Sequence, residues 1–117
     1  MSMTATPSIR ERIRKVQVEL RDGALTPDLT RESLVMLTAL LGNVVDEVRD
    51  REIEYKGVLL ECRRTEGKAN WARILAETSP QYARYREAAD TKLLVVEMIR
   101  SCRTYLRSLD EEMRLQK

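Results

Sequence analysis

An apolar seam runs through the middle of the chain, and its spacing constrains the fold more than any other feature of the sequence. The seam residues recur at alternating steps of three and four: Leu34, Leu37, Leu41, Val44, Val48, Tyr55, Val58 and Cys62. Only Arg51 interrupts this spacing. Such spacing places all these side chains along one face of a helix. We therefore predict a long helix here that packs against another helix.

The composition favours an all-α fold. Of the 117 residues, 43% are apolar and 34% are charged, which is typical of a globular chain and not of a disordered one. Four Gly, three Pro and no Phe leave few of the residues that strands and turns use. We expect a single helical domain over residues 1–117. Its architecture is predicted as a long antiparallel helical hairpin, coiled-coil-like, with a shorter N-terminal helix completing a helical bundle.

Capping residues and glycines indicate where the helices begin and end. Four helices are expected, over residues 8–22, 27–64, 68–77 and 80–116. Ser8 and Glu11 form an S-x-x-E capping pattern, and Thr26 and Ser79 each stand directly before a proline. The seam register continues past Gly67 only weakly, through alanines at positions 69, 72 and 76. We expect a break near Gly67, with an unbroken middle helix as the alternative.

The last helix repeats the three-four spacing and matches the middle helix in length, so the two are expected to pair. Further apolar residues lie beside both seams, which is more apolar surface than one partner helix covers. This surplus predicts self-association, with a dimer as the first expectation. The residues expected at an oligomer or partner interface are Leu34, Leu37, Leu41, Val44, Val48, Val95, Ile99, Leu106 and Leu109. The alternative is that all of them form the core within one chain.

Charge and residue types exclude several classes of protein. The net charge of +2 is too small to indicate a nucleic-acid or membrane partner by itself. No apolar run approaches the roughly 20 residues that span a bilayer, and Met1 to Pro7 lacks the features of a signal peptide, so a cytoplasmic protein is expected. Cys62 and Cys102 are expected to be reduced. The absence of histidine excludes Ser-His and Cys-His catalysis and the common zinc sites, and no cofactor is expected.

A basic cluster near the expected hairpin end is a candidate nucleic-acid site. It contains four cations and the single tryptophan: Arg63, Arg64, Lys68, Trp71 and Arg73. Cations with an aromatic ring that can stack on bases are typical of single-stranded nucleic-acid binders. In the alternative interpretation, Trp71 anchors a short helix on the bundle.

A second row of cations, formed by Arg100, Arg103 and Arg107, lies along one side of the last helix. These three arginines have a spacing that can also follow a phosphate backbone.

Two E-x-x-D steps, Glu47 to Asp50 and Glu87 to Asp90, are the strongest catalytic candidates. Carboxylates three residues apart on a helix can share a Mg²⁺ ion. The steps resemble the sites of all-helical nucleoside triphosphate pyrophosphatases, although the pattern there is E-x-x-E followed by E-x-x-D. In the expected hairpin Glu47 lies opposite the region near Ile99, so only an intermolecular arrangement unites the two steps. The alternative is a solvated charged face.

The stretch from Thr65 to Leu94 resembles small helical proteins encoded by tailed bacteriophages. The residues that carry the resemblance are Glu66, Gly67, Lys68, Ala69, Glu77, Tyr82, Ala88, Asp90, Leu93 and Leu94. The resemblance implies an accessory protein in replication, assembly or host takeover. We predict a non-enzymatic, self-associating protein that acts through a protein-interaction surface, with a single-stranded nucleic-acid binder and a Mg²⁺-dependent nucleotide hydrolase as alternatives.

Overall fold

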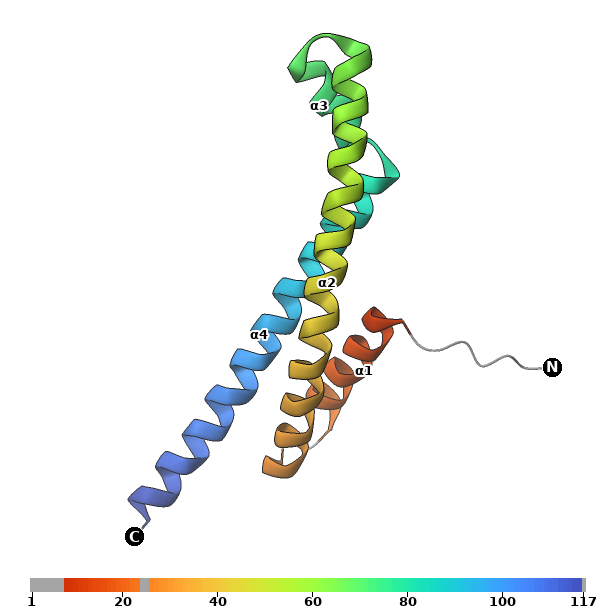
Figure 1. Cartoon of the computed structure of the whole chain (residues 1–117). Coiled ribbons are helices and arrows are strands. Elements are labelled where there is room, and N and C mark those ends of the chain that lie inside the picture. The colour runs from red at the N-terminus through yellow and green to blue at the C-terminus, as the bar shows by residue number, and fades with distance from the viewer. Residues whose placement is uncertain (1–7, 24–25, 117) are drawn as a thin grey trace, which may run out of the picture. The chain divides into compact units, whose positions relative to one another are not determined.

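The computed structural model describes residues 8–23 and 26–116, and it is all-α over these residues. Its helices are α1 (Ile9–Asp22), α2 (Pro27–Glu66), α3 (Ala69–Glu77) and α4 (Pro80–Leu115) (Figure 1). The predicted fold class is confirmed, with the long helices α2 and α4 packed against each other as an antiparallel hairpin and α1 as the shorter helix. Residues 1–7, on which the signal-peptide expectation rests, and residues 24–25, between α1 and α2, lie outside the described residues. None of the four helices is long and apolar enough to cross a membrane.

Side-chain caps begin three of the helices, as the sequence predicts. The Glu11 backbone N–H donates to Ser8 Oγ at 3.2 Å ahead of α1. The Leu29 N–H donates to Thr26 Oγ1 at 3.1 Å, and the Tyr82 N–H donates to Ser79 Oγ at 3.2 Å. Each cap satisfies a backbone donor that has no partner within the first helical turn.

The break after the middle helix is confirmed at Gly67. This residue has a φ of +71°, a backbone conformation that glycine adopts without a steric penalty. Helix α2 therefore ends at Glu66, and α3 begins two residues after the glycine. The turn is closed by a hydrogen bond of 2.8 Å from the Lys68 N–H to the Glu66 carbonyl.

The described chain forms two compact units. Unit 1 contains α1, residues 27–43 of α2 and residues 94–115 of α4. Its core consists of apolar side chains from all three helices, most of them large: Ile13, Val16, Leu37, Leu40, Val95, Met98, Ile99 and Cys102. Burial of such side chains is the main favourable contribution to helix packing.

Unit 2 contains residues 44–66 of α2, all of α3 and residues 80–93 of α4. Its buried apolar residues are mostly alanines: Val44, Ala72, Ala76 and Ala88. Three half-buried tyrosines join its two long segments. The ring centroid of Tyr55 lies 4.9 Å from that of Tyr82 and 5.7 Å from that of Tyr85, and the second pair is stacked. Unit 2 is therefore held by small side chains and aromatic contacts.

Candidate functional site

The residues predicted for an oligomer interface are partly core residues of the single chain. Leu37, Val44, Val95 and Ile99 are buried. The other five are half-buried: Leu34, Leu41, Val48, Leu106 and Leu109. Because these four side chains have most of their surface buried within the chain, the intrachain alternative describes them better than an interface does.

The short helix α3 presents its large apolar side chains to solvent. Trp71, Ile74 and Leu75 are 58%, 47% and 43% exposed, and their spacing of three and four places them on one face, which we call the α3 face. Ala72 and Ala76, by contrast, are fully buried. Interpreting Trp71 as the anchor of this helix is therefore wrong, because α3 packs onto unit 2 through its alanines.

A signal for this orientation is present in the sequence. The register of the apolar seam continues past Gly67 through alanines, including Ala72 and Ala76, so the inward face was marked by small residues. The interpretation of Trp71 as an anchor rested on the size of its side chain alone. Close packing through alanine lets two helices approach closely, and it leaves the bulky residues of α3 on the outside.

The basic candidates lie at the end of α2, in the turn after it and on α3, and all are exposed. Arg64 is paired with Glu61, with 3.3 Å between Nη1 and Oε2. Arg63, Lys68 and Arg73 make no ion pair with any residue that the structure describes. The predicted cluster therefore offers three exposed cations without ion pairs and an exposed indole ring, all within unit 2.

Two charged residues of α3 act on Tyr55 in unit 2. Burial raises the pKa of Tyr55 above its usual 10.0, and the carboxylate of Glu77 raises the same pKa further, whereas Arg73 lowers it. An effect of both charges on one phenol means that Arg73 and Glu77 lie near this ring. Arg73 and Glu77, four residues apart, therefore lie on a different side of α3 from Trp71.

The two E-x-x-D steps lie at similar positions along the antiparallel pair of helices α2 and α4 in unit 2. Tyr55 of α2 lies opposite Tyr82 and Tyr85 of α4. Glu47 precedes Tyr55 by eight residues, and α4 runs antiparallel to α2, so Glu47 lies level with roughly residue 90 of α4. The expectation that Glu47 lies opposite the region near Ile99 is therefore wrong.

The carboxylates of these steps do not gather into a metal site. Glu47 lies 4.0 Å from Arg51, and Asp50 lies 3.6 Å from Arg49. Within the described residues there is no group of three or more side chains able to hold a metal ion. The Mg²⁺-dependent alternative stays a prediction without an assembled ligand set.

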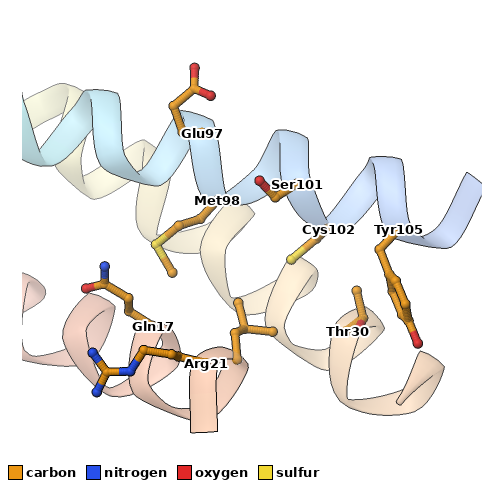
Figure 2. Close-up of a pocket in the computed structure, with 9 residues that line it drawn as sticks. Gln17, Arg21, Thr30, Glu97, Met98, Ser101, Cys102 and Tyr105 are labelled. Atoms are coloured by element: carbon orange, nitrogen blue, oxygen red, sulfur yellow. The ribbon is translucent and has the colours of Figure 1, made fainter. Parts of the chain in front are cut away.

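Unit 1 contains an open pocket of about 360 Å³ between its three helices. Figure 2 shows Met98 and Cys102 pointing from α4 toward α1, while Glu97 points away. Two polar groups of the lining are already engaged: Arg21 Nε with Asp22 at 3.0 Å, and Thr30 Oγ1 with the Thr26 carbonyl at 2.8 Å. The pocket therefore suits an apolar group.

The thiol in this pocket is not activated. Burial raises the pKa of Cys102, which disfavours the thiolate, and both cysteines are free.

Comparisons with known protein families, curated proteins and solved structures find no match to this chain.

Proposed function

We propose that this protein is a non-enzymatic helical protein that self-associates, as a dimer, through the α3 face of unit 2. A single observation carries the proposal: α3 buries Ala72 and Ala76 and leaves Trp71, Ile74 and Leu75 exposed side by side. Large apolar patches on soluble proteins mark interaction sites, and tryptophan is enriched among the residues that dominate binding energy.

Other parts of unit 2 also favour this interpretation. Ile53, Leu60 and Leu93 are each more than half exposed, at 63%, 64% and 65%. A second copy would supply an identical apolar face, and the commonest arrangement of two identical chains makes each face contact its equivalent. A cytoplasmic accessory, adaptor or inhibitor protein of the kind that tailed bacteriophages encode is compatible with such a surface.

The single tryptophan provides a direct measurement, since it lies on the proposed interface. We would record Trp71 fluorescence together with the solution mass by light scattering across a range of protein concentrations. Association buries the indole, so the emission maximum is expected to shift to shorter wavelength at the concentration where the mass doubles. A monomeric mass at all concentrations with unchanged emission contradicts the proposal.

A pair of variants separates association from folding. Ile74→Asp places a charge on the α3 face and is expected to give a folded monomer, because Ile74 is 47% exposed in the single chain. Val35→Asp is the control, because Val35 is 72% exposed on unit 1 and lies outside the α3 face. Circular dichroism reports folding in both. Equal loss of association in the two variants would remove the α3 face as the interface.

The second candidate function is binding of single-stranded nucleic acid, and it rests on the exposed Arg63, Lys68 and Arg73, which make no ion pair within the described residues, together with the exposed indole of Trp71. A mixed-sequence oligonucleotide is expected to quench Trp71 by stacking, and added salt is expected to reverse the quenching because phosphate contacts release counterions. Arg63→Gln with Arg73→Gln should weaken this binding. Arg86→Gln, at another exposed arginine, serves as the control. The absence of quenching at low salt would remove this candidate.

A further inference from the structure

A second surface, in unit 1, combines an apolar floor with a wall of arginines. A groove of about 500 Å³ lies between α2 and α4, and its floor includes Leu41, Val96 and Ile99. Its wall is formed by Arg100, Arg103 and Arg107 of α4. The spacing of three and four places the three guanidinium groups along one side of the helix, next to the aliphatic floor.

Two of the three arginines form no ion pair within the described residues. Arg100 is paired with Glu97, with 2.7 Å between Nη1 and Oε1. Arg103 and Arg107 make no ion pair with any residue in the described part of the chain. They stand four residues apart on one helix face, where like charges oppose helix formation. An anionic partner would relieve this repulsion.

The groove lining indicates what kind of anion fits. Guanidinium groups match carboxylates through paired hydrogen bonds, and they bind phosphates equally well. The lining contains no aromatic residue, so nucleic-acid bases would find no ring on which to stack. The aliphatic floor is suited instead to aliphatic side chains. We propose that this groove binds an acidic amphipathic helix of a partner protein, with aliphatic side chains on the floor and carboxylates on Arg103 and Arg107.

This binding mode is one in which an amphipathic helix lays its apolar face into a groove. It is independent of the proposed self-association, because the α3 face belongs to unit 2 and the groove belongs to unit 1. Failure of one does not decide the other, since the first is read from solution mass and the second from binding of an added peptide.

The probe is a fluorescent synthetic peptide of about 20 residues, long enough to form a helix, with leucines on one face and glutamates beside them. One control peptide keeps the composition in shuffled order, and another keeps the leucines and replaces each glutamate by glutamine. Saturable binding with a Kd below about 1 mM is expected for the amphipathic acidic peptide alone. Amide resonances of Leu41 and Val96 are expected to shift on binding.

A matched pair of variants tests the arginines. Arg103→Gln with Arg107→Gln is expected to weaken binding about tenfold, from the loss of two exposed charge pairs. Arg63→Gln with Arg73→Gln makes the same change in net charge on unit 2 and is expected to change the affinity less than about twofold.

Four results would overturn the proposal: no saturable binding, equal binding of the shuffled peptide, equal weakening by both double variants, or tighter binding of an oligonucleotide than of the peptide at this groove. The proposal would also be overturned if the double variant Arg103→Gln, Arg107→Gln had a lower solution mass than the wild type but bound the peptide equally well. That result would assign the groove to a second copy of the chain.

Discussion

The two units of the chain bury different kinds of side chain. Unit 1 buries mainly large aliphatic residues, among them Ile13, Leu37 and Val95, whereas unit 2 buries chiefly alanines. Unit 2 also leaves a tryptophan and several aliphatic side chains exposed. The three-four seam that contributes to the core of unit 1 continues into unit 2 through half-buried residues, among them Val48, Tyr55 and Val58. The difference indicates that the largest apolar side chains of α3 contribute little to the core of unit 2 and are available to a partner.

The energetic contrast follows from side-chain size. Fully burying a Leu, Ile or Val side chain contributes about 1.5–3 kcal/mol, and burying the single methyl group of an alanine contributes much less. Unit 2 therefore gains less from its own packing per buried residue. Burying Trp71, Ile74 and Leu75 against a second copy would add the burial of large apolar side chains that the core of unit 2 lacks.

The largest expected effect is at the core of unit 1. Ile99 is 6% exposed, and Ile99→Asp would bury an unpaired carboxylate there. We expect a loss of about 4 kcal/mol or more of unfolding free energy, enough to unfold much of the chain. Urea denaturation followed by circular dichroism measures it. Val44→Asp, at a buried residue of unit 2, is expected to be similarly destabilising. A folded, monomeric Ile99→Asp protein would instead show that this residue belongs to an interface.

Most of the fold was predictable because helix formation is governed by local signals. Ser8, Thr26 and Ser79 act as caps through hydrogen bonds to backbone groups three residues away. Gly67 adopts the positive φ that its residue type permits. These interactions lie within one turn of the chain, so residue identity and spacing were sufficient to place the helix ends.

The orientation of α3 and the register of unit 2 were not predictable in the same way. Periodicity shows which side chains share a face, but not which of two apolar faces points inward. In α3 the alanine face could approach its neighbours closely, and the larger face remained outside. The position of Glu47 along the hairpin relative to Glu87 depends on the register between α2 and α4. The tyrosine contacts of unit 2 define this register, and residue spacing within one helix does not predict it.

The rates at which a thiol reagent modifies the two cysteines report how tightly each unit is packed. Cys102 of unit 1 is buried with a raised pKa, whereas Cys62 of unit 2 is half-buried. We expect a thiol reagent to modify Cys62 at least about tenfold faster, because Cys102 reacts only after local opening. Single Cys→Ser variants assign the two rates. Equal rates would mean that the core of unit 1 opens as readily as the packing of unit 2.

A smaller effect is expected at two glycines inside α2. An added Cβ at Gly42 in unit 1 or at Gly57 in unit 2 meets no atom of the described residues within 4 Å. Gly42→Ala and Gly57→Ala are each expected to stabilise the chain by about 1 kcal/mol, as measured by thermal melting. Gly57 lies between the exposed Ile53 and Leu60, so a partner packed against this face would make Gly57→Ala weaken association as well. If only Gly42→Ala weakened association, the interface would lie in unit 1 and not in unit 2.

The smallest effect is a dependence of stability on pH above 10. Because burial and then the carboxylate of Glu77 raise the pKa of Tyr55, the folded chain retains the phenol proton at a pH where the unfolded chain loses it. This contribution is fully present below the usual pKa of 10.0 and is lost as pH rises through the raised value. Tyr55→Phe has no phenol to ionise, so its stability should fall less between pH 9 and 11 than that of the wild type. Other groups that ionise in this range are common to both proteins and cancel in the comparison. Identical pH profiles in thermal melts would show that Tyr55 is as solvated in unit 2 as in the unfolded chain, and that the tyrosine contacts do not shield it.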